Sequence, residues 1–259
     1  MRNIVAFTMA AVLLLSAVSC GKKNDAPAVS VSVETTAEPA TTLPVTTEPV
    51  ETAPVTVVEI PQETKDEMKA KLEELRDTVP DLYGWIRIND TLVDYPMVQS
   101  EDNDFYLNYN VYRQWDELGS IFVDYRNRLE VEDPYNYNIV IYGHNLTWGG
   151  MFHDVQLMFE NEELFRNSYI YIYTFDGIYV YQPFAIYEAN AYYQYFRTHF
   201  DYPEEFIAFA EEMRGNSIYP VDVEFTGEDA MITLSTCTNT YMDGRYSLQA
   251  KLVQVTRWE

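Results

Sequence analysis

The chain has 259 residues, and its 41 acidic and 17 basic side chains give a formal net charge of −24. This charge repels phosphate backbones and leaves no Lys/Arg clusters for nucleic-acid binding, so we exclude nucleic acid as a partner. After a leader and a tail, the remaining length suits one domain of roughly 180 to 200 residues. The 22 tyrosines and 13 phenylalanines, many in alternating runs, favour a mainly β fold, because aromatic side chains pack well on a pleated surface.

Residues 1–20 have the pattern of an export signal. Arg2 supplies a positive charge, an apolar run covers Ile4–Val18, and small residues precede Cys20. The run is shorter than the ~20 apolar residues that a membrane-spanning helix requires. The letters AVSC resemble a lipobox, which predicts that Cys20 is lipidated and becomes the mature N-terminus. Simple cleavage and an uncleaved anchor are the alternatives. We expect an extracytoplasmic domain that is tethered to the outer face of the cell membrane.

Residues 21–61 form the second part of the chain. From Asn24 to Pro61 they are rich in Thr, Val, Pro and Glu, with no Gly, no aromatic residue and no Lys or Arg. Such a segment cannot bury a core, so we expect a disordered, extended tether. At ~3.1 Å per residue it would reach on the order of 100 Å. Its predicted role is to hold the folded part, residues 62–259, away from the membrane.

The folded part is predicted to begin with an amphipathic helix. Thr64 and Glu67 suggest a capping box, and Pro80 ends the pattern. The apolar residues at helical spacing are Met68, Leu72, Leu75 and Val79. A second helix is predicted in YPEEFIAFAEEMRG, with Pro203 near its start, Gly215 at its end, and an apolar face made by Phe206, Phe209 and Met213.

The rest of the folded part alternates between strand-like runs and turn residues. The runs are rich in β-branched and aromatic residues and are separated by Asn, Asp, Gly and Pro. In chain order they are YGWIRI, SIFVDY, NYNIVIYG, SYIYIYTF, GIYVYQPFAIYEA, AMITLSTC and RYSLQAKLVQV. The second predicted helix lies between the last two strands and the others.

The last two strands carry the most informative pair of residues. In the first, Cys237 lies on the face opposite the apolar pair Ile232 and Leu234, so we expect it to face a groove. In the second, Arg245 lies on the polar face. Only eight positions separate the two residues, so a hairpin would put the guanidinium beside the thiol. The alternatives are a small buried cysteine and a surface ion pair between Arg245 and Asp243.

A nucleophilic cysteine needs a proton-transfer partner, and histidine titrates near neutral pH. Of the three histidines, His144 follows a buried-looking strand and enters a loop, where catalytic residues are often presented. It is our candidate, although a loop histidine bonded to backbone would give the same pattern. We interpret His153 and His199 as surface or packing residues. One thiol and scattered histidines do not suit a structural zinc site, so we expect neither metal nor cofactor.

Several motifs together resemble one family. LSTC followed by DGRYSLQA is similar to the T-L-x-T-C and downstream arginine signature of sortases, and YGHN resembles their histidine motif. GWIRINDTLVDYPMVQSEDNDFYLNYN and GSIFVDYRN are similar to the N-terminal part of class B sortases. The likeness covers about residues 62 to 257. It implies a closed eight-stranded β-barrel with N-terminal helices and one inserted helix before the strand that carries the cysteine.

The resemblance also implies a chemistry. A sortase cleaves a sorting motif near the C-terminus of an exported protein through a thioester and transfers the product to an amine of the peptidoglycan stem peptide or of a pilin. By carry-over, Cys237 is the nucleophile, His144 the acid and base, and Arg245 the group that binds substrate backbone and stabilises the oxyanion. The positions that match substrate-binding residues are Asn103, Leu107, Tyr142 and Ser235.

Two other classes of function remain open from the sequence. A cell-wall peptide hydrolase would also use cysteine and histidine, although in papain-like enzymes the cysteine usually precedes the histidine. A non-catalytic lipoprotein that binds extracellular ligands would carry the thiol incidentally.

Overall fold

The computed structural model describes residues 57–128 and 137–258. The predicted export signal, Cys20 and most of the predicted tether lie outside the described residues. No helix within the described ranges is long and apolar enough to cross a membrane.

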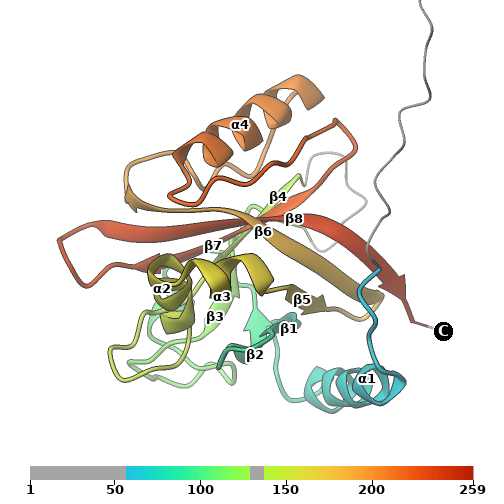
Figure 1. Ribbon diagram of the computed structural model, residues 1–259. Coiled ribbons are helices and arrows are strands. Elements are labelled where there is room, and N and C mark those ends of the chain that lie inside the picture. The colour runs from blue at the N-terminus through green and yellow to red at the C-terminus, as the bar shows by residue number, and fades with distance from the viewer. Residues whose placement is uncertain (1–56, 129–136, 259) are drawn as a thin grey trace, which may run out of the picture. The chain divides into compact units, whose positions relative to one another are not determined.

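Eight strands of the described chain close into a barrel (Figure 1). They are β1 (Leu82–Ile88), β2 (Asp94–Val98), β3 (Ile121–Val123), β4 (Asn138–Tyr142), β5 (Ile170–Tyr173), β6 (Gly177–Asn190), β7 (Met231–Cys237) and β8 (Gly244–Arg257). Around the barrel they follow the order β1-β2-β3-β4-β7-β8-β6-β5, and β5 closes the ring on β1. The β2/β3 and β4/β7 pairs are parallel and the others antiparallel. The mainly β prediction and the eight-stranded barrel are confirmed.

Strand β2 is not predicted by the strand-like runs of β-branched and aromatic residues. It contains Pro96, which has no backbone N–H to donate and so weakens any strand pattern. The segment nevertheless pairs with β1 on one side and with β3 on the other. Pairing partners, which lie elsewhere in the chain, therefore decide this strand.

The barrel interior is apolar, and the last two strands contribute the faces that their alternation predicts. The inward-facing residues Ile232, Leu234, Tyr246 and Leu248 are buried in one cluster with side chains of the other strands. On the opposite face of β7, Met231 belongs to a second apolar cluster outside the barrel. The polar residues of that face thereby lie on the outer surface, where a groove can form.

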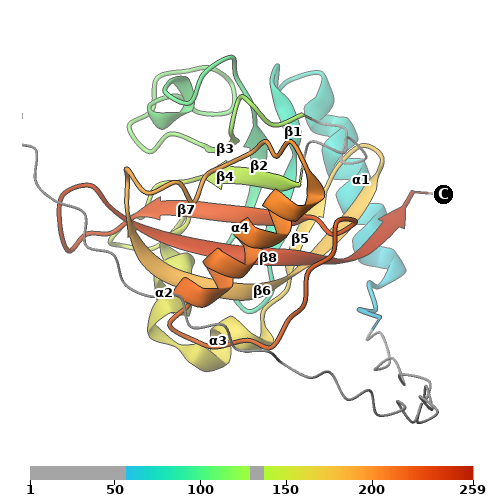
Figure 2. The same ribbon diagram turned by 90° about the horizontal axis from the view of Figure 1, so that it is seen from above.

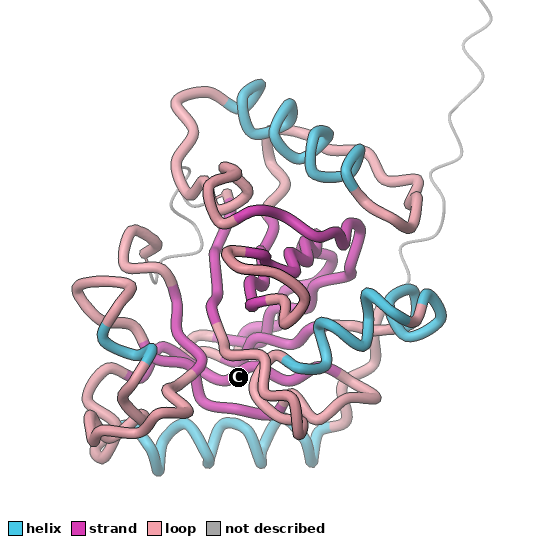
Figure 3. The backbone as a smooth tube through the Cα atoms, turned by 90° about the vertical axis from the view of Figure 1, so that its left-hand side faces the viewer, coloured by secondary structure: helices cyan, strands magenta, loops and turns pink. Residues whose placement is uncertain are grey.

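Helices cover the outside of the barrel. They are α1 (Gln62–Arg76), the short 3-10 helix η1 (Phe105–Leu107), α2 (His153–Glu160), α3 (Glu162–Asn167) and α4 (Pro203–Asn216). Figures 1 and 3 show α1 and α4 on opposite sides of the strands. Among the described residues α1 is the one helix before β1. Buried Val155 and Met158 of α2 join the interior cluster, so α2 helps to cover the barrel core.

The helix predicted from Pro203 is confirmed as α4, which lies across β6, β7 and β8 when the molecule is seen from above (Figure 2). Its Phe206, Phe209 and Met213 are buried against Phe184 and other residues of the outer cluster. Each such side chain contributes roughly 1.5–3 kcal/mol on burial. The helix continues one residue past Gly215 to Asn216. The end of β7 and the start of β8 extend beyond the helix (Figure 2).

The capping box predicted at the start of α1 is wrong. The helix begins at Gln62, so Thr64 lies inside its first turn and caps nothing. The residue at the N-cap position is Pro61, whose carbonyl accepts a hydrogen bond from the backbone N–H of Lys65 at 3.2 Å. The helix therefore starts earlier because a proline, with its fixed backbone angle, precedes it.

Contacts with the barrel also begin before residue 62. The backbone N–H of Val58 donates to Oε1 of Gln254 at 2.8 Å, and Nε2 of Gln254 donates to the carbonyl of Val58 at 3.1 Å. The side chains of Val58 and Ile60 pack on the cluster formed by α1, β5 and β6. The last residues of the segment predicted as tether are thus attached to β8.

Candidate active site

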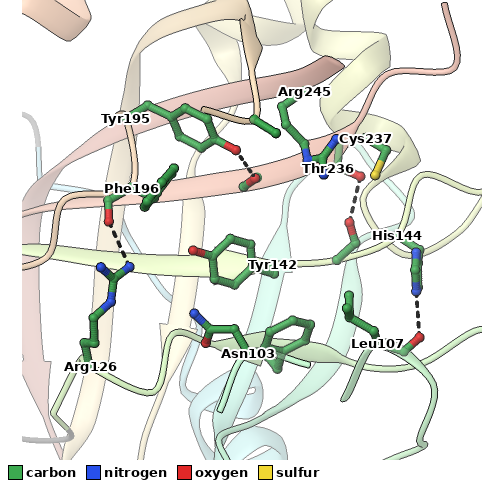
Figure 4. Close-up of a pocket in the computed structure, with 14 residues that line it drawn as sticks. Asn103, Leu107, Arg126, Tyr142, His144, Tyr195, Phe196, Thr236, Cys237 and Arg245 are labelled. Carbon is green, nitrogen blue, oxygen red and sulfur yellow. Dashed lines mark hydrogen bonds between the residues drawn. The ribbon is translucent and has the colours of Figure 1, made fainter. Parts of the chain in front are cut away.

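A pocket of about 290 Å³ lies at the ends of β4 and β7 and the start of β8 (Figure 4). All seven catalytic and substrate-binding residues predicted from the sequence line it: Asn103, Leu107, Tyr142, His144, Ser235, Cys237 and Arg245. These positions are spread over more than half of the described chain. The barrel brings them together because β4 and β7 run side by side in parallel and β7 and β8 form a hairpin.

Cys237 is the last residue of β7, and its unpaired thiol is partly exposed in the pocket. Arg245 lies directly opposite it in the β7/β8 register. A guanidinium N–H of Arg245 donates to the carbonyl of Gly244 at 2.9 Å. No carboxylate in the described part of the chain forms a salt bridge with Arg245. The ion pair with Asp243 that the sequence left open is therefore not formed. The guanidinium therefore retains donors for a ligand in the pocket.

His144 follows β4 in a tightly constrained loop. A side chain at Gly143 would place its Cβ 2.8 Å from the ring of Phe152, so glycine allows this ring to approach the loop. Nε2 of His144 lies 2.8 Å from the carbonyl oxygen of Leu107. A carbonyl only accepts, so Nε2 carries the hydrogen and Nδ1 remains free to exchange a proton. Figure 4 shows the imidazole at the same end of the pocket as the Cys237 sulfur.

The other two histidines take positions outside the described lining of the pocket. His153 is the first residue of α2 and bonds to the side chain of Asn145. His199 is exposed, and its Nε2 lies 3.2 Å from a carboxylate oxygen of Asp201. Of the three histidines, His144 is thus the one placed to exchange a proton with a pocket ligand.

The opposite end of the pocket is built on Asp124, which comes directly after β3 and is completely buried. One of its oxygens accepts from the backbone and Nε of Arg126, at 3.0 and 2.8 Å. The other accepts from Arg126 Nη2 at 2.6 Å, from Asn103 at 2.9 Å and from the Tyr142 hydroxyl at 2.9 Å. A single carboxylate thus orients three side chains that line the pocket.

The electrostatics of this cluster fix its protonation states. Burial would raise the pKa of the Asp124 carboxyl, but hydrogen bonds from Arg126 and Tyr142 lower it below its usual range. The bonds to Asp124 raise the pKa of the Arg126 guanidinium. Burial, followed by the charge of Asp124, raises the pKa of the Tyr142 hydroxyl. At neutral pH the carboxylate is therefore ionised, and Tyr142 remains a donor toward it.

The side of the pocket below α4 is formed by the segment between β6 and α4. The hydroxyl of buried Tyr195 and the hydroxyl of Ser235 lie 2.9 Å apart. The neighbouring Phe196 lines the pocket, and its carbonyl accepts from Arg126 at 3.2 Å. Burial raises the pKa of Tyr195, so its hydroxyl is neutral. This segment links the two ends of the pocket.

Sequence reasoning missed Asp124, Arg126, Tyr195 and Phe196. For Asp124 a signal existed, because a charged residue directly after a buried strand in SIFVDYRN needs a partner. Tyr195 and Phe196 lie in an aromatic-rich segment without periodicity, which offered no such signal. In the described ranges no group of three or more His, Cys, Asp and Glu side chains is arranged to hold a metal ion.

Comparison with known proteins identifies the family. The profile of the sortase domain matches residues 86–253. The chain belongs to the sortase family. It is 34% identical over 189 residues to sortase B of Listeria monocytogenes, covering 72% of this chain and 76% of that protein. It is 29% identical over 202 residues to sortase B of Staphylococcus aureus, covering 74% and 78%.

Solved structures of sortase B are also similar to this chain. The X-ray structure of sortase B from Clostridium perfringens matches with a TM-score of 0.65 at 31% identity, covering 70% of this chain and 99% of that one. A Staphylococcus aureus sortase B–substrate complex matches with a TM-score of 0.66 at 28% identity, covering 76% and 89%. The chain is therefore a class B sortase, a cysteine transpeptidase of the family that sorts proteins to the cell wall.

Proposed function

We propose that this sortase cleaves a C-terminal sorting motif of exported proteins at Cys237 and joins the product to an amine of the cell wall or of a pilin. The observation that carries the proposal is the convergence of Cys237, His144 and Arg245 in one pocket, with the guanidinium unpaired by any described carboxylate. Acyl transfer through a thioester needs a nucleophile, a proton-transfer group and a donor to the oxyanion, and cysteine, histidine and arginine can supply these three.

In the first half of the reaction, the thiolate of Cys237 attacks the carbonyl carbon of the scissile amide. The C–N bond breaks, His144 gives a proton to the departing amine, and a thioester to Sγ remains. In the second half, an incoming amine attacks the thioester carbonyl and His144 accepts its proton. The new amide forms as the C–S bond breaks, which returns the thiolate. Because Nε2 is bonded to Leu107, we assign both proton transfers to Nδ1.

Arg245 acts on the oxygen that becomes negative in both tetrahedral intermediates. Its planar guanidinium fork can bond the oxyanion and a substrate carbonyl together. Asn103, Leu107, Tyr142 and Ser235 would hold the motif along the pocket. Two of these, Asn103 and Tyr142, are held by Asp124, so the groove is preformed before substrate arrives.

A screen by intact-mass spectrometry tests this proposal. The protein is incubated with pooled short synthetic peptides of varied sequence, and a mass increase on Cys237 reports the thioester. Adding a small primary amine then separates transfer from hydrolysis, because transfer yields an amide product at the expense of the free acid. Release of free acid alone, unaffected by amine, would favour the peptide hydrolase. Slow, unselective alkylation of Cys237 with no acyl-enzyme would favour a non-catalytic lipoprotein.

We further propose that the domain is held at the outer face of the cell membrane by a lipid on Cys20 and an extended tether. The support is the sequence of residues 1–61, since AVSC precedes a Thr/Pro/Glu-rich segment that has no means to form a core. Intact-mass analysis of membrane-extracted protein, beside a Cys20→Ala variant, tests it. An unprocessed N-terminus with unmodified Cys20 would contradict lipidation and leave the catalytic proposal unaffected.

A further inference from the structure

Asn145 links the two residues of the proposed catalytic pair, and both polar atoms of its side chain, Nδ2 and Oδ1, form hydrogen bonds. It directly follows His144 in the chain. Its Nδ2 donates to the backbone carbonyl of Cys237 at 3.0 Å and to Oε1 of Gln156 at 2.8 Å. Its Oδ1 lies 2.9 Å from Nδ1 of His153. The motif YGHN supplied His144, but the proposed chemistry gives this asparagine no role.

The orientation of the Asn145 amide is determined by its partners. The carbonyl of Cys237 only accepts, so the atom that faces it must be the nitrogen. Oδ1 then faces His153, whose Nδ1 must donate. The next link has the same polarity, because Nε2 of Gln156 donates to Glu160 at 2.8 Å. His153, Gln156 and Glu160 are three and four residues apart on α2, so one helix face holds the amide in place.

The bond to Cys237 connects the histidine loop to the last residue of β7. Two more hydrogen bonds join these segments. The backbone N–H of Gly143 donates to the carbonyl of Ser235 at 3.2 Å, and the hydroxyl of Thr236 donates to the carbonyl of Gly143 at 2.7 Å. Beyond the last residue of β4 the two segments no longer pair as strands. The Asn145 side chain therefore joins the peptide unit of the nucleophile to the residue after the proposed acid and base.

We propose that Asn145 is a positioning residue that fixes the distance between the His144 imidazole and the Cys237 sulfur, with α2 as its support. The inference rests on the proposed function, because it needs these two side chains to react together. A small displacement of reacting groups costs up to about 100-fold in rate even when binding is intact. Loss of Asn145 should therefore lower kcat and leave KM nearly unchanged.

The experiment compares Asn145→Ala and Asn145→Asp with the wild-type chain. The peptide that gives the highest acyl-enzyme yield in the screen above serves as substrate, and single-turnover acylation and steady-state kinetics are measured where all proteins are fully folded. We expect kcat to fall about 10- to 100-fold in both variants, with KM within about twofold. The aspartate keeps the acceptor for His153 and the shape of the side chain but loses both donated bonds, so it remains informative if the alanine variant does not fold.

Asn161→Ala is the matched control. Asn161 caps α3 through bonds from the backbone N–H groups of Glu163 and Leu164, away from the pocket lining. Its loss should lower the thermal midpoint without changing kcat, which separates lost stability from lost positioning. Wild-type kcat in both Asn145 variants, or a rise in KM alone, would overturn the inference only. A wild-type chain that never forms a thioester would overturn the proposed function and this inference with it.

Discussion

The two ends of the pocket are held in opposite ways. At one end, Asp124 is completely buried and accepts five hydrogen bonds from Arg126, Asn103 and Tyr142. At the other, Cys237 and His144 are partly exposed, and within the described ranges the imidazole has one hydrogen bond, to the backbone carbonyl of Leu107. Satisfied bonds thus accumulate where the groove must keep its shape. The groups proposed to exchange protons and form covalent bonds, Nδ1 of His144 and the thiol of Cys237, remain available for the substrate.

The difference has a physical basis. A substrate groove gains affinity when its side chains are fixed before binding, because less conformational entropy is then lost. A nucleophile and its acid and base must change bonding partners during each turnover, so permanent partners would oppose the reaction. Their positions are instead set from outside the reacting groups, by the β7/β8 register and by the loop after β4, which the Asn145 side chain bonds to the carbonyl of Cys237. Substitutions at the two ends should therefore have different consequences.

Cys237→Ala should have the largest effect on activity and little effect on the fold. With no nucleophile, the acyl-enzyme and both products should be undetectable by mass spectrometry. Because the thiol is partly exposed and lies outside the apolar clusters of the described chain, the free energy of unfolding should change by no more than about 1 kcal/mol. Thermal unfolding of the variant checks the second part. Normal turnover in a folded variant would refute the proposed chemistry.

Arg245→Lys should lose most of the activity although the charge is kept. A point charge cannot reproduce the planar fork, and removal of an oxyanion donor costs about 100- to 1,000-fold in kcat. Arg214→Lys is a suitable control, because Arg214 pairs with Glu211 on α4 and should tolerate the change. Rates are compared with the peptide identified in the screen. If the Arg245→Lys variant worked at the wild-type rate, charge alone would suffice there.

These two positions also show what the sequence could reveal. Side chains alternate along a strand and a short loop forces two strands to pair, so local pattern predicts that Cys237 and Arg245 lie side by side on the outer face. The interior positions Leu234 and Leu248 follow from the same alternation. Helix α4 was predictable because proline, acidic residues and an apolar stripe all lie within the segment itself.

The features that escaped prediction depend on distant parts of the chain. Asp124 bonds to Asn103 and Tyr142, which are 21 and 18 positions away, and Asn145 reaches Cys237 across 92 positions. Strand β2 exists because two neighbours pair with it despite Pro96. No periodicity within a segment carries such information. Such information emerges only when the barrel closes, so contacts at both ends of the pocket, those of Asp124 and that of Asn145, escaped prediction.

Asp124→Asn should act on binding and stability together, unlike the substitutions at the reactive end. The amide keeps the shape of the side chain but removes the negative charge to which Arg126 and Tyr142 donate hydrogen bonds. Its NH₂ group would face these donors and cannot accept from them. Hydrogen bonds to charged groups contribute about 1.5–3 kcal/mol each to stability. Because Arg126 is partly solvated, its bonds count for less, and we expect the free energy of unfolding to fall by about 2 kcal/mol in all. KM should rise more than kcat falls. Urea unfolding and steady-state kinetics measure the two effects.

The same carboxylate should make stability depend on acid pH. Burial opposes ionisation of Asp124, but the bonds from Arg126 and Tyr142 prevail and hold its pKa below the unfolded value. Its contribution is therefore present above pH about 4, the ordinary value of an aspartate, and is lost as pH falls through the lower folded value. Unfolding midpoints measured from pH 7 downward should fall more steeply for wild type than for Asp124→Asn. Equal slopes would show that other carboxylates carry the acid sensitivity.

Tyr142→Phe should have the smallest effect of the series. The change removes one of five hydrogen bonds to Asp124 and keeps the ring, whose centroid lies 5.2 Å from that of Phe122. The carboxylate keeps its bonds from Arg126 and Asn103, so the cost should be about 1 kcal/mol of stability with a rise in KM of a few-fold. Denaturant unfolding and kinetics on the same peptide measure both. A rise in KM as large as that of Asp124→Asn would mean that the Tyr142 hydroxyl itself bonds the substrate, and the groove end would then be less fixed than its five bonds suggest.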